Sequence, residues 1–305
     1  MPCYSPLKGY RTLKNGKNSF TLHRKDAAND SDLSSIACGQ CIGCRIQRSK
    51  DWAIRCVNEM ESHEHSSFLT LTYAPENLPD NGTLQKQHLS TFFKVYRTWL
   101  QRKTQQKIRY YACGEYGTEK SRPHYHAIIF GHEFSDKYPW TKINGKQYYR
   151  SPQLEKLWPH GTSLFCEANI GTAAYVSKYI TKKITGDQSI DAYGYLDEET
   201  GEILQIIPEY TTMSTVPGIG GNWLDKYHKT DLTKGYITHE GVKFRIPRYY
   251  MDRLEKLDPS LHQLIKESTA ARMADKESET YERLLQREKH AQLVLKQELR
   301  DLEKA

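Results

Sequence analysis

The sequence predicts an α+β protein built on an antiparallel sheet, with helices on one side of it. Four short segments have the side-chain pattern of strands: 66–73, 108–115, 124–131 and 163–166. Three longer segments carry apolar residues at helical spacing: 45–60, 85–103 and 171–184. Two of the strands are separated only by the turn-forming residues 117–123, and a short connection of this kind joins antiparallel neighbours.

Length and composition exclude several classes of protein. The chain has 305 residues, of which 37% are hydrophobic and 11% aromatic, which is enough to build a buried core. It contains no apolar run long enough to span a membrane, and its first residues lack the pattern of a secretory signal. We therefore expect a soluble protein with one large domain and attachments, or with two smaller domains.

The net charge of +7 is unevenly distributed along the chain. Residues 259–305 contain nine Lys and Arg and nine Asp and Glu, so the whole excess lies in residues 1–258. Most of the 21 Tyr and all five Trp lie there too. Basic side chains among aromatic ones are typical of surfaces that bind phosphates and stack on unpaired bases. An ordinary, slightly basic protein would have the same total charge.

Changes in composition divide the chain into four parts. Residues 186–258 contain turn signals but no clear period, and the residues from 259 onward have the pattern of one long, charge-rich helix. The predicted parts are a cysteine-rich segment with a helix at 1–59, a sheet domain at 60–185, an accessory DNA-contact region at 186–258 and a charged helical tail at 259–305.

Three of the seven cysteines have the spacing Cys38-x-x-Cys41-x-x-Cys44. Thiolates at this spacing bind zinc when a fourth ligand completes a tetrahedron, and Cys3 is the most suitable fourth residue, ahead of Cys56 or His23. A structural zinc ion would explain how so polar a segment becomes ordered. The alternatives are reduced thiols without a metal, or an iron–sulfur cluster. The other thiols lie on apolar faces and are expected in the core: Cys56, Cys113 and Cys166.

His124 and His126 lie two residues apart on one predicted strand, so that they face the same side of it. Glu115 ends the preceding strand, and the short turn brings it beside them if the two strands pair as a hairpin. Two imidazoles and one carboxylate with open coordination positions suit Mg²⁺ or Mn²⁺ acting on a phosphate. Two unrelated surface histidines and a solvated carboxylate would give the same pattern.

Tyr175 and Tyr179 are one turn apart on a predicted helix, beside a second row formed by Lys178 and Lys182. A tyrosine, whose pKa is about 10, is a useful nucleophile only where the phosphate is polarised and the developing charge is neutralised. A cation held by the histidines, with a lysine nearby, would provide both conditions. The alternative is an amphipathic helix that buries two tyrosine rings.

Three motifs, in this order, resemble those of HUH endonucleases, the rolling-circle replication initiators that are related to conjugative relaxases. They are Phe68–Tyr73, His124-Tyr125-His126, and Tyr175-x-x-x-Tyr179 with Lys178. The chain is similar in particular to the initiators of gokushoviruses, a branch of the microviruses. Two further segments, 38–45 and 217–220, also resemble that group, and the similarity extends over residues 1–225.

The resemblance implies a ferredoxin-like antiparallel sheet, with the histidines on a central strand and the tyrosine helix packed beside them. It implies that residues 60–185 form a nickase domain that cuts one strand of a phage origin. One tyrosine would attack the scissile phosphate, leaving a 5′-phosphotyrosyl link and a free 3′ hydroxyl that primes synthesis. The second tyrosine would cut the regenerated origin, and the released 3′ hydroxyl would close the circle.

The resemblance also implies roles for single residues and for partners. The residues expected to carry catalysis are Tyr175, Tyr179, Lys178 and Lys182, with His124, His126 and Glu115 as ligands of Mg²⁺ or Mn²⁺. The residues beside these motifs that we expect to contact single-stranded origin DNA are Arg122, Lys183, Thr70 and Thr72. Because the sequence shows no ATPase or helicase motif, a host helicase and a host DNA polymerase are expected partners, in the host cytoplasm. Two rival functions fit the sequence: a zinc-containing nucleic-acid-binding protein without activity, and a metal nuclease that uses water as its nucleophile.

Overall fold

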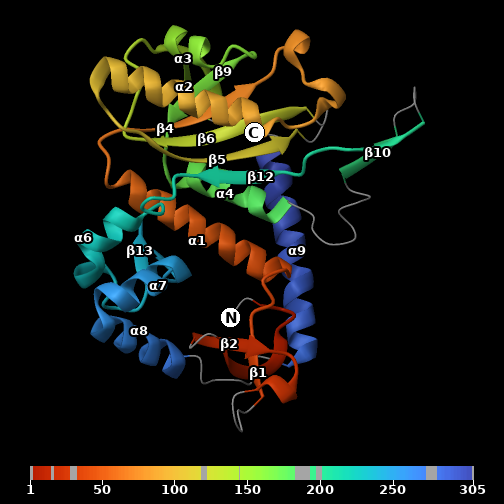
Figure 1. Ribbon diagram of the computed structural model, residues 1–305, viewed down its shortest axis with the longest axis vertical. Helices are drawn as coiled ribbons and strands as arrows, with labels where there is room; N and C mark the ends of the chain where they lie inside the picture. The colour runs from red at the N-terminus through yellow and green to blue at the C-terminus, as the bar shows by residue number, and fades with distance from the viewer. Residues whose placement is uncertain are drawn as a thin grey trace. The chain divides into compact units, whose positions relative to one another are not determined.

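The computed structural model describes residues 3–14, 17–27, 33–117, 122–143, 145–182, 193–196, 201–272 and 280–303 (Figure 1). The chain divides into two compact units. The smaller unit consists of residues 1–48 and 270–304, and the larger unit of residues 49–269. The sheet predicted from the sequence lies in the larger unit, and the clustered cysteines lie in the smaller one.

The larger unit is built on a seven-stranded sheet in which all neighbouring strands are antiparallel. In spatial order the strands are β12 (Tyr210–Met213), β5 (Arg109–Tyr116), β6 (Pro123–Phe130), β4 (Ser66–Thr72), β9 (Ser163–Glu167), β8 (Lys146–Arg150) and β7 (Tyr138–Ile143). The predicted α+β class with an antiparallel sheet is therefore confirmed.

Helices cover both faces of this sheet, so the prediction of helices on one side is wrong. The helices on one face are α2 (Lys86–Thr104) and α3 (Pro152–Leu157), and those on the other are α1 (Ile42–Met60) and α4 (Ile170–Lys182) (Figure 1). The reason lies in the central strand β6. Ala127 and Ile129 join the core beneath α2, whereas Ile128 and Phe130 join the core beside α1 and α4. A strand that is apolar on both sides needs a cover on each.

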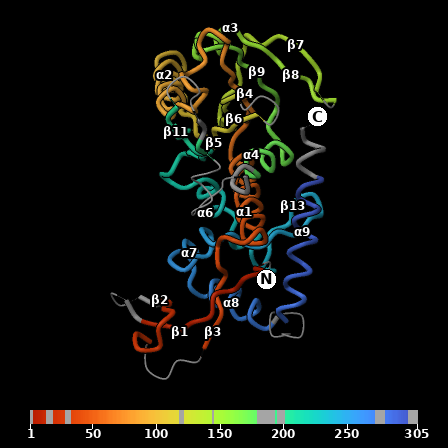
Figure 2. Tube along the Cα trace, turned by 90° about the vertical axis from the view of Figure 1, so that its right-hand side faces the viewer, coloured from red at the N-terminus to blue at the C-terminus, as the bar shows by residue number. Residues whose placement is uncertain are grey.

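The remaining elements of the larger unit are the β7–β8 hairpin at one edge of the sheet, two helices that pack on α1, and several short elements. The β7–β8 hairpin forms one edge of the sheet and lies away from α2 in the side view (Figure 2). Two helices, α6 (Gly221–Asp231) and α7 (Arg248–Leu257), pack on α1, where Asn58 donates a hydrogen bond of 3.0 Å to the Tyr250 hydroxyl. The short elements are η2 (Pro75–Asn77), η3 (Asp80–Gly82), β10 (Gly194–Leu196), β11 (Ile203–Gln205), β13 (Ile237–His239) and β14 (Val242–Phe244).

The smaller unit contains strands that the sequence did not predict. They are β1 (Leu7–Lys14), β2 (Lys17–Thr21) and β3 (Ser34–Ile36), which form an antiparallel sheet in the order β2-β1-β3, with a short helix η1 (Arg24–Asp26). These residues are polar and have no sustained period, so no apolar alternation marks the strands.

The charged C-terminal region is helical, but the prediction of one long helix is wrong. The region forms α8 (Pro259–Arg272) and α9 (Tyr281–Glu303). Thr280 is not helical, and its hydroxyl accepts a hydrogen bond of 3.5 Å from the Arg283 N–H, which satisfies a free donor in the first turn of α9. None of the described helices combines the length and the apolar character that crossing a membrane requires.

Candidate active site

The register of two central strands brings one carboxylate and two imidazoles together. Glu115 near the end of β5 lies opposite His124 on β6. The Gly117 N–H donates to the carbonyl of Arg122 at 3.0 Å, which closes the connection between these strands. As a result, Oε1 of Glu115 lies 2.5 Å from Nε2 of His124 and 3.1 Å from Nε2 of His126.

Burial and hydrogen bonding set the charge of this group. Only 2% of Glu115 and 5% of His126 is exposed to solvent. Burial alone would raise the pKa of Glu115, but the hydrogen bonds from both histidines outweigh it and hold that pKa below its usual value. Burial also lowers the pKa of His126. The carboxylate is therefore ionised and the imidazole of His126 neutral near pH 7, and these are the forms that bind metal ions.

Two features of this group fit a bound divalent cation. The second carboxylate oxygen of Glu115, Oε2, is buried and has no hydrogen-bond partner in the described part of the chain. When Nδ1 of His124 donates to the carbonyl of Arg122 at 3.1 Å, the neutral ring can offer its Nε2 lone pair to a cation, in place of the hydrogen bond from Nε2 to Glu115. A cation would satisfy both the oxygen and the lone pair. The three candidate ligand atoms lie within 4.8 Å of one another.

Thr70 holds the second histidine in place. Its hydroxyl on β4 lies 3.1 Å from Nδ1 of His126, and the ring of Phe68 stacks on the same imidazole at 5.3 Å. A hydrogen bond at Nδ1 orients Nε2 toward the ligand side. We predicted Thr70 as a DNA contact and missed this positioning role. Its signal in the sequence is alternation along β4, since Phe68 and Thr70 face the same side as the histidine on the neighbouring strand.

The helix α4 brings a tyrosine to this group. Asn169 fixes the start of the helix, because its Oδ1 accepts from the Thr172 N–H at 3.0 Å and its own N–H donates to the Thr172 hydroxyl at 2.8 Å. The Tyr175 hydroxyl then lies 3.4 Å from Nε2 of His126, and the two rings meet edge to face at 5.0 Å. A phenol oxygen therefore lies beside the candidate metal ligands.

The other predicted residues of the tyrosine helix are described only in part. Lys178 lies on α4 with its side chain half-buried. Tyr179 and Lys182 also belong to α4, but their side chains lie outside the described residues, and so does the whole of Lys183.

Two predicted DNA contacts have partners within the protein at this end of the sheet. The Arg122 guanidinium donates to the carbonyl of Tyr73 at 3.0 Å. The Thr72 hydroxyl donates to the carbonyl of Thr162 at 3.2 Å. Thr72, the last residue of β4, thus lies opposite His124, and Arg122 directly precedes the histidine strand.

The four clustered cysteines of the smaller unit form a second group able to hold a metal ion: Cys3, Cys38, Cys41 and Cys44. The sulfurs of Cys3 and Cys41 are 3.9 Å apart, and those of Cys38 and Cys44 are 4.0 Å apart. Sulfurs bound at about 2.3 Å around a tetrahedral zinc ion would be about 3.8 Å apart, so the spacing fits zinc. The remaining thiols, Cys56, Cys113 and Cys166, are buried in the core as predicted.

Backbone N–H groups donate to two sulfurs of this cluster, and at one of them they favour the thiolate. The Tyr4 N–H donates to the sulfur of Cys41, and the Cys38 N–H donates to the sulfur of Cys3, both at 3.3 Å. Burial raises the pKa of the Cys3 thiol, but at Cys41 the hydrogen bonds from the backbone of Tyr4 and Cys44 and from the neighbouring thiols outweigh burial and lower the pKa to about 7. The cluster therefore holds at least one sulfur in the form that binds metal ions.

Comparison with known proteins shows to which family the chain belongs. Residues 66–184 match the family model of the replication-associated protein ORF2/G2P. The replication-associated protein ORF2 of Spiroplasma virus 4 is 29% identical over 274 residues, which are 84% of this chain and 81% of that protein. The replication-associated protein VP4 of Bdellovibrio phage phiMH2K is 30% identical over 269 residues, 85% of this chain and 79% of that protein. The chain belongs to this family of phage replication-associated proteins.

A third replication-associated protein, ORF4 of Chlamydia phage 1, is 32% identical over 227 residues, 73% of this chain and 54% of that protein. No solved structure matches the chain significantly. The family relationship confirms the resemblance to gokushovirus-type rolling-circle initiators that the motifs indicated. The segment of the present chain that matches the family model runs from β4 to α4. It includes Glu115, both histidines and Tyr175, whereas the cysteine cluster lies outside it.

Proposed function

We propose that this replication-associated protein nicks one strand of phage origin DNA and transfers the cut strand, and so initiates rolling-circle replication. The observation that carries the proposal is the position of the Tyr175 hydroxyl, 3.4 Å from Nε2 of His126. A phenol beside a group of metal ligands suits attack on a phosphodiester. Residues 60–185 would then be the HUH nickase domain, with the ferredoxin-like arrangement that its family resemblance implies.

In the proposed step the phenolic oxygen of Tyr175 attacks the scissile phosphorus and forms a new phosphorus–oxygen bond. The bond between phosphorus and the 3′ oxygen breaks, so that one strand ends in a 3′ hydroxyl and the other is joined to the tyrosine through its 5′ phosphate. The phenol loses its proton to solvent, and the leaving 3′ oxygen gains one. Because one phosphodiester replaces another, a 3′ hydroxyl can reverse the reaction and close a strand without an added energy source.

Glu115, His124 and His126 are the residues that would hold Mg²⁺ or Mn²⁺ in the nickase site. Such a cation, when bound, would polarise the phosphate and neutralise charge that develops on its oxygens. The chain's own contribution is orientation, since Thr70 and the carbonyl of Arg122 each contact an imidazole Nδ1 and leave Nε2 facing the site.

Tyr179 is the proposed second nucleophile because it follows Tyr175 by one turn of α4. Lys178 and Lys182 lie on the same helix, and we propose that their ammonium groups neutralise phosphate charge. The residues proposed to bind the flanking nucleotides are Arg122, Thr72 and Lys183.

We also propose that Cys3, Cys38, Cys41 and Cys44 hold a structural zinc ion. Their sulfur spacing supports this, and the polar sequence around them supplies few apolar side chains for a core of its own. The proposed partners are origin DNA and, since the sequence lacks a helicase motif, a host helicase and DNA polymerase in the host cytoplasm.

The experiment that tests the proposal uses a labelled single-stranded oligonucleotide of the origin with Mn²⁺. We expect an adduct between protein and DNA that survives denaturation, and we expect the linked peptide to contain Tyr175 or Tyr179. Binding without any adduct would instead support a binding protein without activity. A variant with both Tyr175→Phe and Tyr179→Phe should bind DNA but not cut it; cleavage by this variant would show that water is the nucleophile.

A further inference from the structure

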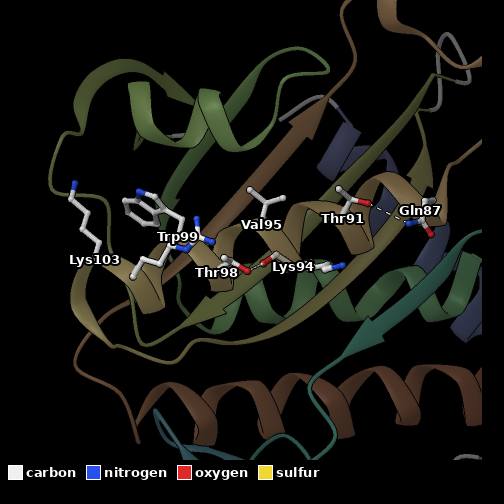
Figure 3. Close-up of a pocket in the computed structure, with 8 residues that line it drawn as sticks. Gln87, Thr91, Lys94, Val95, Thr98, Trp99 and Lys103 are labelled. Atoms are coloured by element: carbon white, nitrogen blue, oxygen red, sulfur yellow. Dashed lines mark hydrogen bonds between the residues drawn. The ribbon is translucent and has the colours of Figure 1, made fainter.

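The outer face of α2 is a shallow groove that the proposed nickase chemistry does not use. The groove follows the helix from Gln87 at one end to Lys103 at the other (Figure 3). The polar residues that line it are exposed: Gln87, Thr91, Lys94, Thr98, Arg102 and Lys103. At about 1.5 Å of rise per residue, this stretch of helix is about 24 Å long.

The charge of this region is of one sign. Residues 81–114 contain seven Lys and Arg and no Asp or Glu. Across the described residues, no ion pair joins Lys94, Arg102 or Lys103 to a carboxylate. Some other cations of the larger unit do have such a partner, for example Arg245 with Asp51 at 2.6 Å and Arg248 with Asp252 at 3.6 Å. The groove therefore presents cations whose charge the protein itself does not compensate.

The core packing of α2 directs these cations outward. The inner side of the helix is an aromatic and aliphatic stripe, with Leu89, Phe92, Phe93, Tyr96 and Leu100 buried. The positions between them are left to solvent, and they hold lysine, arginine, threonine and glutamine side chains. These are donor groups of the kind that contact phosphate oxygens.

The near end of the groove lies at the same end of the sheet as the candidate active site, over the opposite face. The hydroxyl of Tyr125, the residue between the two histidines, accepts a hydrogen bond of 2.8 Å from the Gln85 N–H and donates one of 2.9 Å to the Gln85 carbonyl. Gln85 immediately precedes α2. The groove therefore starts at the end of the sheet that carries His124 and leads away from it on the opposite face.

We infer that the outer face of α2 binds the phosphodiester backbone of the DNA that continues beyond the scissile phosphate. The inference rests on the proposed nickase function, because that function supplies a DNA strand at the end of the sheet from which the groove starts. An acidic protein partner is disfavoured, since the only exposed large hydrophobic residue in the groove is Val95, at 44% exposure, and protein interfaces have an apolar centre. Trp99, half-buried under Lys103 at 5.3 Å, adds a surface on which a base can stack.

The test is the salt dependence of DNA binding in a variant with Lys94→Gln, Arg102→Gln and Lys103→Gln. Three probes are compared: a single strand of about 10 nucleotides, the same strand with a long single-stranded extension, and the same strand with a duplex flank. For each probe we compare the slope of the logarithm of the DNA association constant against the logarithm of the salt concentration. With the extended probe that reaches α2, the magnitude of this slope should be about 2–3 smaller for the variant than for the wild-type protein. With the short probe the two proteins should have the same slope. The two extended probes distinguish a single-stranded from a duplex occupant.

A matched control loses the same charge elsewhere on the larger unit and outside the predicted DNA-contact region 186–258, through Lys142→Gln, Lys156→Gln and Lys266→Gln, all at exposed positions. The control should keep the wild-type slope with every probe. An unchanged slope in the α2 variant, or an equal fall in the control, would overturn the inference. The proposed nickase function is tested separately, by adduct formation between the wild-type protein and the short strand. A failure of the α2 inference can therefore be distinguished from a failure of the nickase proposal.

Discussion

The hydroxyl of Tyr175 lies 3.4 Å from Nε2 of His126, although 49 residues separate them in the chain. The relationship depends on three local structures: the pairing of β6 with β4, the start of α4 fixed by Asn169, and the edge-to-face contact of the two rings. Since Phe68 also packs against both rings, at 5.3 Å and 5.9 Å, the phenol has little freedom to move away from the imidazole.

Replacing Tyr175 by phenylalanine should remove the proposed nucleophile and leave the packing intact. We expect the rate of covalent adduct formation to fall at least about 1,000-fold, with DNA affinity unchanged within a few fold. Gel analysis of the denatured adduct measures the first quantity, and fluorescence anisotropy the second. The control variant Tyr138→Phe, on β7 and outside both the candidate site and the predicted DNA-contact region, should form the adduct at the wild-type rate. Wild-type rates in Tyr175→Phe would assign the first cut to another residue.

Replacing Thr70 by valine should weaken metal binding without removing a ligand. The hydroxyl lies 3.1 Å from Nδ1 of His126, and the loss of such an orienting bond typically lowers metal affinity about 10–100-fold. We expect the Mn²⁺ concentration for half-maximal cleavage to rise by this factor, with cleavage restored at high Mn²⁺. As a control, Ser67→Ala removes a hydroxyl of the same strand that bonds the carbonyl of His132, and it should leave the Mn²⁺ requirement unchanged. A loss of cleavage that high Mn²⁺ cannot restore would refute the positioning role.

Much of the sheet could be predicted from the sequence because its central strands are strongly apolar. Strand β6 contains a continuous apolar run, and the helix α2 carries apolar residues at an unbroken helical period. The same strand also contained the signal for helices on both faces, since its alternate residues are apolar on both sides. Which helix covers which face of the sheet depends on the path of the chain between the elements, and no single segment of the sequence determines that path.

Other elements left no pattern to read. Strand β12 (Tyr210–Met213) has only four residues, and it is a strand because it pairs with β5. In the smaller unit, β1 has no sustained alternation, and it is a strand because it pairs with β2 and β3. The position of Glu115 opposite His124 was predictable because a short turn fixes the register, whereas the contact of Thr70 with His126 required the pairing of a strand more than 50 residues away.

The cysteine cluster should contain about one zinc ion per chain of purified protein. We expect Cys41→Ser to lose this zinc and to open the segment before α1 to proteases, because the polar strands there have little core of their own. Metal analysis and limited proteolysis measure the two effects. Cys166→Ser, at a buried position in the sheet of the larger unit, should keep the zinc. Less than about half a zinc per wild-type chain would contradict the proposed site.

Stability should fall in mild acid partly because of His132. Burial lowers the pKa of this histidine to about 4, and its Nδ1 lies 2.7 Å from the Tyr96 hydroxyl, which donates to the neutral ring. Above pH 6.5 the ring is neutral in both the folded and the unfolded chain, so its contribution to stability is complete. As the pH falls from about 6.5 to about 4, the unfolded chain binds a proton that the folded protein does not, and stability decreases by about 1–2 kcal/mol after allowance for solvent screening.

The variant His132→Gln removes this titration, so its free energy of unfolding should fall less steeply than that of the wild-type protein between pH 6.5 and pH 4.5. Urea unfolding at a series of pH values measures both slopes. The variant will be less stable at pH 7, since the ring also packs at 5.0 Å against Phe134, and for this reason the comparison concerns the slopes and not the absolute values. Equal slopes would show that the ring takes up its proton equally readily in the folded and unfolded chains, which contradicts a buried, neutral His132.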